Sequence, residues 1–226
     1  FQRRLVDQPL MQNVIADLAL EVEAATLLAF RLARAVDDEL AGDAAAALLV
    51  RIGTPVGKYW NCKRAVGVVH EALECHGGNG FVEEGPMARL YREAPLNGIW
   101  EGSGNIIALD VLRAAARSPD SVPAFLDEVG LAKGGDRRLD RMVARLEAEL
   151  GAAEEHEARA RRIVERMALC LQASLLIRHS PQAVADAFCA TRLDGDGGGA
   201  YGSLPAGLDQ RAIVERANIA ASDAGL

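Results

Sequence analysis

Apolar residues recur every three or four positions along most of this chain, which is the spacing of one face of an α-helix. The first such stretch covers residues 9–38, and its apolar face is formed by Met11, Val14, Leu18, Val22, Ala25, Ala29, Leu32 and Val36. The opposite face carries polar side chains, and Pro9 suits the first turn of a helix. The pattern therefore predicts one long amphipathic helix over residues 9–38.

A second long helical pattern runs from Ala44 to Cys75, after a polar hinge at residues 37–43. Pro55 lies inside this pattern, so we expect a kink or a weakened turn near Gly53. We expect one basic patch on this helix, formed by Lys58, Lys63 and Arg64.

The remaining helical patterns are shorter and are separated by polar or glycine-rich segments. A helical turn is predicted at residues 86–90, and a helix that ends at about Arg117 follows residue 105. The composition changes at Ser118–Pro123, which we interpret as the boundary between two subregions. Further helices are predicted at residues 137–150, 154–176, 181–191 and 208–221. Because we find no alternating strand pattern longer than about four residues, the sequence predicts an all-α fold.

The composition narrows the class of protein. Half of the 226 residues are hydrophobic but only 4% are aromatic, which favours helices packed closely through small residues. The net charge of −7 argues against non-specific binding of nucleic acid or membranes by the whole chain. We find no apolar run of about 18 residues and no signal peptide, so we expect a cytoplasmic protein. The chain starts at Phe1 rather than at a methionine, which fits a fragment of something longer.

The cysteines and the acidic loop do not indicate a metal site. Four cysteines lie inside apolar helical patterns without the spacing of metal ligands: Cys62, Cys75, Cys170 and Cys189. We interpret them as reduced thiols of the core. The loop at residues 194–199 contains two aspartates, but it lacks the ligand spacing of a calcium-binding EF-hand loop. We therefore expect no metal.

One carboxylate, Glu101, stands in an unusual setting. It follows Trp100 and precedes Gly102 and Gly104, which allow a ligand to approach the backbone closely. A helical pattern begins just after it, so free backbone N–H groups and positive helix potential collect there. We expect Ser103 or Asn105 to cap this helix. A lone acid in a loop is more often solvated surface, and at this stage both interpretations remain open.

The glycine-rich segment His76–Gly80 ends the second long helix with more glycines than a single helix cap needs. Such a segment can present backbone N–H groups to an anion. A glycine-rich helix end is more often plain punctuation, so this motif is weak evidence by itself.

Three blocks of sequence together resemble the C-terminal helical domain of acyl-CoA dehydrogenases. The blocks are Glu74–Phe81, Arg89–Glu93 and Ile99–Ile106, and their order and spacing also match. The alkylation-response (AidB-like) branch of this family shares the Ile-Trp-Glu-Gly-Ser-Gly-Asn-Ile run and a longer helical C-terminal extension. The resemblance implies an antiparallel helical bundle over residues 1–117 and an additional helical subdomain over residues 118–226.

The resemblance also implies a chemistry. In this family, a carboxylate at the position of Glu101 removes the α-proton of an acyl-CoA thioester, while a hydride leaves the β-carbon for the flavin of FAD. Such a base works best in a dry pocket, because burial raises the pKa of a carboxylate. Contacts to FAD are expected from Phe1, Gly77, Gly78, Ser103 and Asn105.

The chain departs from the family pattern in three ways. Gln2 replaces the glycine that usually follows the phenylalanine, and Glu74 stands where many members carry a glutamine. An acid at that position would repel a pyrophosphate unless it were screened. The N-terminal helical domain and the middle β-domain of the family are absent from this sequence, so we expect the isolated chain to be inactive.

The resemblance leaves other functions open. Family members pair so that the C-terminal domain of one subunit touches the flavin of its neighbour, which implies a homodimer or homotetramer. The alkylation-response branch is linked to DNA binding through its C-terminal region, so an alternative is a DNA-binding flavoprotein with little dehydrogenase activity. However, acids outnumber Lys and Arg from residue 120 onward, and many of these charges alternate in sign along helices. Such a pattern is typical of a solvated, salt-bridged face. A third interpretation is a purely structural oligomerisation module.

Overall fold

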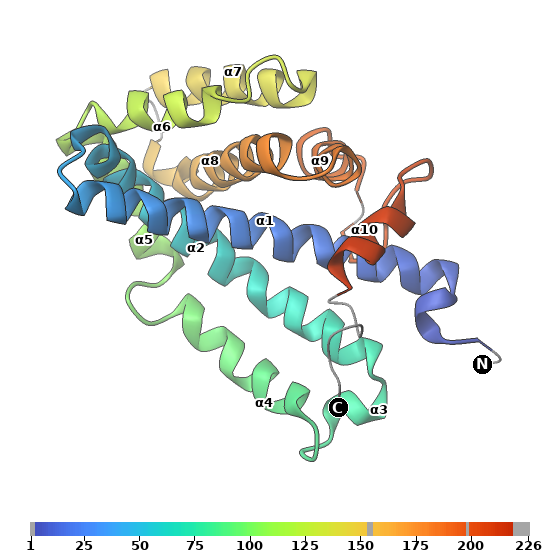
Figure 1. Ribbon diagram of the computed structural model, residues 1–226. Helices are drawn as coiled ribbons and strands as arrows, with labels where there is room; N and C mark the ends of the chain where they lie inside the picture. The colour runs from blue at the N-terminus through green and yellow to red at the C-terminus, as the bar shows by residue number, and fades with distance from the viewer. Residues whose placement is uncertain (1–2, 153–155, 198, 219–226) are drawn as a thin grey trace.

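The computed structural model describes residues 3–152, 156–197 and 199–218, and within them every regular element is a helix (Figure 1). The all-α prediction is therefore confirmed for the described residues. The N-terminal region contains η1 (Leu5–Asp7), α1 (Pro9–Leu40), α2 (Ala44–Cys75), α3 (Gly78–Phe81), α4 (Pro86–Glu93), η2 (Ala94–Gly98) and α5 (Gly104–Arg117). The C-terminal region contains α6 (Ser121–Gly130), α7 (Arg137–Gly151), α8 (His156–His179), α9 (Gln182–Phe188), the π-helix η3 (Cys189–Leu193) and α10 (Gln210–Ala217).

The two long helices begin and end close to where the sequence pattern places them. Pro9 occupies the first turn of α1, and the Asp43 side chain caps α2 by accepting hydrogen bonds from the N–H groups of Ala45 and Ala46. The predicted polar hinge is shorter than expected, because α1 continues to Leu40. α2 is one uninterrupted helix in which Pro55 is buried.

Two glycines of α2 allow the long helices to approach closely. A Cβ atom added at Gly53 would lie 2.7 Å from Cδ2 of Leu32, and one added at Gly57 would lie 2.6 Å from Cδ1 of the same side chain. Both distances are far shorter than an ordinary van der Waals contact. Leu32 of α1 thus fits into a notch on α2 that only glycine leaves open, and this notch sets where the helices cross.

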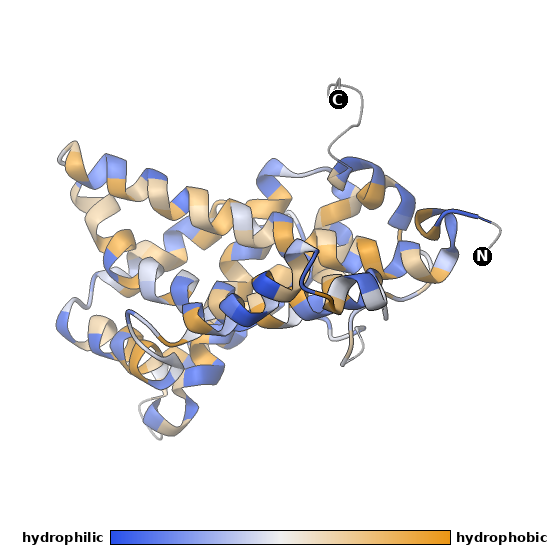
Figure 2. Cartoon of the chain, turned by 90° about the horizontal axis from the view of Figure 1, so that it is seen from below, coloured by the Kyte–Doolittle hydropathy of each residue, from blue (hydrophilic) through white to orange (hydrophobic). Residues whose placement is uncertain are grey.

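Helix α8 is the centre of the C-terminal region. It is buried on nearly all sides from Ile163 to Leu176, and it packs against α1, α2, α5, α6 and α7. A helix with this distribution of apolar residues belongs inside a protein rather than on its surface. In Figure 2 the helices facing the viewer carry both hydrophilic and hydrophobic residues. One hydrophobic core contains residues from both regions. The composition of the sequence changes near residue 118, and a domain boundary between residues 117 and 118 stays a prediction.

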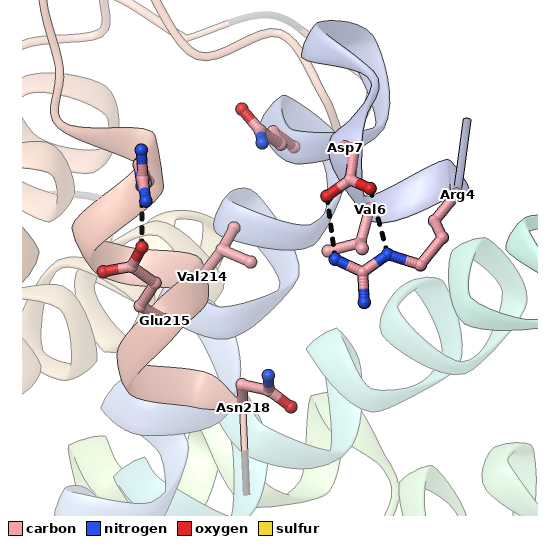
Figure 3. A pocket seen from close by; sticks show the side chains of 8 residues that line it. Arg4, Val6, Asp7, Val214, Glu215 and Asn218 are labelled. Atoms are coloured by element: carbon pink, nitrogen blue, oxygen red, sulfur yellow. Dashed lines mark hydrogen bonds and ion pairs between the residues drawn. The ribbon is translucent and has the colours of Figure 1, made fainter. Parts of the chain in front are cut away.

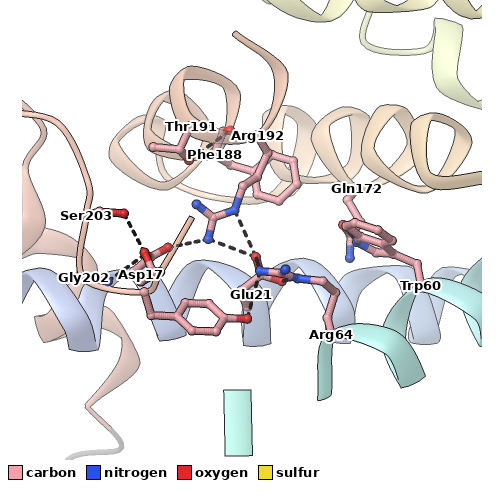
Figure 4. Close-up of polar contacts among 12 residues, drawn as sticks. Asp17, Glu21, Trp60, Arg64, Gln172, Phe188, Thr191, Arg192, Gly202 and Ser203 are labelled. Carbon is pink, nitrogen blue, oxygen red and sulfur yellow. Dashed lines mark hydrogen bonds and ion pairs between the residues drawn. The ribbon is translucent and has the colours of Figure 1, made fainter. Parts of the chain in front are cut away.

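A buried cluster of charges also joins the two regions (Figure 4). Arg192 of the π-helix binds Asp17 and Glu21, which both lie on α1. Arg64 of α2 binds Glu21 through two hydrogen bonds of 2.8 and 3.1 Å, and donates a third to the Tyr201 hydroxyl at 2.9 Å. The predicted basic patch is therefore divided, because Arg64 points to this cluster instead of standing with Lys58 and Lys63.

The structure corrects the expectations about shorter elements. α6 begins within the segment Ser118–Pro123, which the sequence pattern assigns to a boundary. Pro123 lies in the first turn of this helix, where a helix tolerates proline. The glycine segment forms the short helix α3 after a turn at Gly77. Residue 154, where one helix is predicted to begin, lies outside the described residues. Residue 221, where the last helix is predicted to end, lies outside them as well.

Candidate functional site

Glu101 lies in a left-handed turn directly before α5. Its φ is +54°, and it is the one non-glycine residue with a positive φ among the described residues. Such a conformation costs about 1–2 kcal/mol for a residue with a Cβ. Gly102 follows with a φ of +110°, and a Cβ added to it would lie 2.6 Å from Cδ1 of Ile107. The two residues together reverse the chain, and Gly102 is required for both conformation and space.

Three basic side chains converge on the segment after Glu101. The Lys58 ammonium donates a hydrogen bond of 2.5 Å to the Gly102 carbonyl. Lys63 lies beside Gly104, since a Cβ added there would be 2.8 Å from its Cε atom. Arg161 of α8 donates through Nε to Oδ1 of Asn105 at 2.8 Å. The start of α5 therefore combines the positive end of a helix with three cations, which favours a bound anion.

α5 is fixed to α2 by a further ion cluster one turn beyond this segment. Arg51 donates to both carboxylate oxygens of Asp110 at 3.0 and 3.2 Å, and Arg113 adds a bond of 3.1 Å. The hydrogen bond from Arg51 holds the pKa of Asp110 below its usual value. These contacts fix the position and rotation of α5, and with them the place of Glu101.

The other predicted site residues at the start of α5 do not cap this helix through their side chains. Ser103 is the N-cap of α5, although its side chain makes no capping hydrogen bond, and its carbonyl accepts from the Ile107 N–H at 3.0 Å. Asn105 lies inside the first turn and bonds to Arg161 instead of capping the helix. Phe1 lies outside the described residues.

Gly77 and Gly78 are exposed, and a Cβ added to either would meet no atom within 4 Å. They follow the C-terminal end of α2, whereas Lys58 and the start of α5 lie farther back along it (Figure 1). The helix from Lys58 to Cys75 spans roughly 25 Å at about 1.5 Å per residue. A single chain therefore does not bring the glycine segment to Glu101.

The described residues leave Glu101 exposed, together with Trp100, which is 56% exposed. The dry pocket that a base needs is therefore not formed by this part of the protein alone. The segment from α3 to the start of α5 also exposes an unusual number of large apolar side chains: Phe81, Val82, Leu90, Tyr91, Leu96, Ile99, Trp100 and Ile106. A surface of this kind is typical of an interface.

Two cavities of the described residues have linings that do not include Glu101. One of about 350 Å³ separates α10 from the start of the chain (Figure 3), where its charged residues are paired as Arg4 with Asp7 and Arg211 with Glu215. Another, of about 360 Å³, lies between Leu10 and Cys75. The described residues contain no group of three or more His, Cys, Asp or Glu side chains that could hold a metal.

Sequence reasoning did not identify the role of Lys58 or of Arg161. The sequence predicts a basic patch on α2, but no local pattern shows that Lys58 turns toward Gly102 while Arg64 turns away. Arg161 lies 56 residues beyond Asn105, and no local pattern joins them. Both contacts arise from the packing of α2 and α8 on α5.

Comparisons with known proteins show which family the chain resembles. The family model described as "Acyl-CoA dehydrogenase, C-terminal domain" matches residues 1–116. The chain is 40% identical over 198 residues to the putative acyl-CoA dehydrogenase AidB of Escherichia coli, and the match covers 88% of this chain and 36% of that protein. It is 33% identical to acyl-CoA dehydrogenase family member 11 of Caenorhabditis elegans, over 63% of this chain and 24% of that protein.

Solved structures extend the likeness into the C-terminal region. The crystal structure of Caenorhabditis elegans ACDH-11 in complex with C11-CoA superposes with a TM-score of 0.75 at 28% identity, covering 83% of this chain and 37% of that one. An acyl-CoA dehydrogenase from Bacillus anthracis, solved with FAD, has the same fold with a TM-score of 0.64 at 18% identity, covering 96% and 42%. This chain thus spans between 24% and 42% of the length of these relatives. By its sequence and its fold, the chain belongs to the acyl-CoA dehydrogenase family.

Proposed function

We propose that this chain is the C-terminal part of a FAD-dependent acyl-CoA dehydrogenase and that Glu101 is its general base. The observation that carries the proposal is the left-handed turn at Glu101, which presents a carboxylate just before α5 among three cations. A strained backbone at one acidic residue is typical of a functional site. The likeness to ACDH-11, solved with C11-CoA, supports an acyl-CoA thioester as the substrate.

The residues present fit a FAD molecule at its periphery. Gly77 and Gly78 offer open backbone, and the cations around Ser103 and Asn105 suit the negative charge of a dinucleotide. When bound, FAD supplies the acceptor for the hydride that leaves the β-carbon. Because the glycine segment lies roughly 25 Å along α2 from the Glu101 turn, we infer that the two contribute to different FAD molecules in an oligomer.

The chemical role of this chain is proton removal. Glu101 takes the α-proton of the thioester, and its position follows from the turn and from α5 rather than from the side chain alone. The rest of the enzyme has to exclude water from Glu101, since the described residues leave it exposed. The isolated chain is therefore expected to be inactive and to bind FAD weakly, a property that titration with FAD would measure.

Substitution of Glu101→Gln in the full-length protein tests the proposal. Glutamine preserves the shape of the side chain but cannot accept the proton, so the rate of flavin reduction by an acyl-CoA should fall at least roughly a hundredfold. FAD content and folding should be unchanged. Glu93→Gln is the matched control, because Glu93 is an exposed acid at the end of α4, and its loss should change the rate only a few-fold. Near-normal reduction in the Glu101 variant would refute the assignment.

Assembly and location are part of the same proposal. The exposed apolar side chains from α3 to the start of α5 support a homodimer or homotetramer, because such a surface is costly to leave in water. Sedimentation of the full-length protein would show its oligomeric state, and a monomer at micromolar concentration would contradict this assembly.

A cytoplasmic location stays a prediction. In the described residues, none of the helices has the length and apolar character needed to span a membrane.

A further inference from the structure

The turn that presents Glu101 is not stable because of its own sequence. Glu101 has a φ of +54°, which is unfavourable for a residue with a Cβ, and only Gly102 is free of this cost. The Ser103 side chain makes no capping bond to the start of α5. Contacts from elsewhere in the fold must therefore select this conformation over alternatives in which the carboxylate points in another direction.

Lys58 makes the contact that is best placed to do so. Its ammonium donates to the Gly102 carbonyl at 2.5 Å, and this carbonyl belongs to the peptide between the turn and the N-cap. A hydrogen bond from a charged donor is shorter and stronger than one between neutral groups. The bond therefore fixes the orientation of the peptide that follows the base.

The backbone that carries Lys58 is held in place by its neighbours. Its neighbours in the chain, Gly57 and Tyr59, are both buried, and Gly57 lies in the notch where α2 receives Leu32 of α1. The Lys58 side chain is half-buried, so its stem is packed while the ammonium reaches the turn. A rigid donor on a long helix meets an acceptor on a strained turn, which is how precise active-site geometry is held.

We propose that Lys58 is a positioning residue for the base: it locks the Glu101–Gly102 turn through the Gly102 carbonyl and so aims the Glu101 carboxylate. Lys58 does not touch the reacting atoms in this role, and Glu101 alone takes the proton. The inference rests on the proposed function, because it gives Lys58 a catalytic effect only if Glu101 is the base.

Substitution of Lys58→Met tests the inference, because methionine keeps the apolar stem and removes the donor. In the 226-residue chain, hydrogen exchange of the Ile107 amide should become roughly tenfold faster, since this amide donates to the Ser103 carbonyl directly after the turn. In the full-length protein loaded with FAD, the limiting rate of flavin reduction should fall about ten- to a hundredfold. The substrate concentration at half-maximal rate and the FAD content should stay near the wild-type values.

Two further variants serve as controls. Lys133→Met removes the same charge from an exposed lysine between α6 and α7, and it should change neither readout. Lys58→Arg keeps a charged donor and should restore most of the lost rate. If Lys58→Met does not fold, Lys58→Ala provides the same test, because alanine has no donor and suits a helix.

The outcomes separate the two proposals. Faster exchange with an unchanged rate of flavin reduction would overturn the positioning role and leave Lys58 as a structural residue only. Unchanged exchange would overturn it as well. If an acyl-CoA reduces the flavin of the Glu101→Gln variant at a normal rate, the proposed function fails. Hydrogen exchange of the Ile107 amide still reports in that case whether Lys58 locks the turn. A loss of FAD content in Lys58→Met would also refute the inference, because it would show a role in binding the cofactor.

Discussion

The strongest prediction about stability concerns Arg192, whose guanidinium neutralises two buried carboxylates. The side chains of Asp17 and Glu21 are only 4% and 6% exposed, and that of Arg192 is 15% exposed. Arg192→Met removes the charge while keeping an apolar stem of similar length. Both carboxylates then remain in a buried place with fewer partners, which is more costly than losing the pair as a whole.

The magnitude follows from the partners that remain. Removing one member of a buried ion pair usually costs about 3–5 kcal/mol. Here Glu21 keeps two hydrogen bonds from Arg64, and Asp17 keeps one from the Gly202 N–H at 3.0 Å. We therefore expect the lower end of that range, about 3 kcal/mol. Because Arg192 lies on the π-helix and its partners lie on α1, the loss should loosen the C-terminal region from the bundle.

Urea unfolding of the 226-residue chain, followed by circular dichroism, measures this free energy. Arg141→Met is the matched control, because it breaks a pair with Asp194 whose side chains are 67% and 51% exposed. Exposed pairs contribute about 0–1 kcal/mol, so this variant should be almost as stable as the wild type. A double variant with Asp17→Asn should cost less than the sum of its single substitutions, since the two residues interact directly.

The result that would refute the reasoning is equal stability of Arg192→Met and Arg141→Met. It would mean that the carboxylates of Asp17 and Glu21 find solvent or other partners without cost. The packing of the C-terminal region on α1 would then depend on the hydrophobic core alone.

Two more predictions follow from the packing and charges. Gly57→Ala should lower the free energy of unfolding by about 1–3 kcal/mol, because the new Cβ would lie 2.6 Å from the Leu32 side chain. Gly67→Ala should instead raise it by up to about 1 kcal/mol, because the nearest neighbour of its Cβ is Tyr201 at 3.5 Å and alanine favours a helix. Urea unfolding of both variants measures these changes, and an equal loss of stability in the two would contradict the notch. Burial acts to raise the pKa of Glu128, but hydrogen bonds from Arg31 and Arg178 outweigh it and hold that pKa below 4.5. The ionised Glu128 side chain therefore contributes its full stability above about pH 4.5, and this contribution is lost as the pH falls through the folded-state pKa. Glu128→Gln should make the free energy of unfolding fall less steeply with decreasing pH. A decline as steep as that of the wild type would refute the role given to Glu128.

The long helices and the glycine-flanked motif around Glu101 are predictable from local sequence patterns. The repeat of apolar residues predicts α1 and α2 almost to their ends, because a helix satisfies its hydrogen bonds within four residues and its buried face recurs at that period. Pro9 and Asp43 mark the helix starts for equally local reasons. The place of Glu101 just before a helix was also readable from the glycines beside it and the apolar pattern that follows.

The contacts between side chains at the candidate site depend on how the helices pack. Lys58 reaches Gly102 across 44 residues and Arg161 reaches Asn105 across 56, while Arg64, on the same helix as Lys58, turns to Glu21 instead. These directions depend on how α1 and α2 cross and on the burial of α8, which are properties of several helices packed together. Local periodicity specifies the extent of α1 but not its buried face, since Val22 and Val36 of the predicted face are exposed whereas Leu20 and Leu28 are buried. Both the buried face and the partner of a charged side chain depend on the rotation and crossing of helices far apart in the chain.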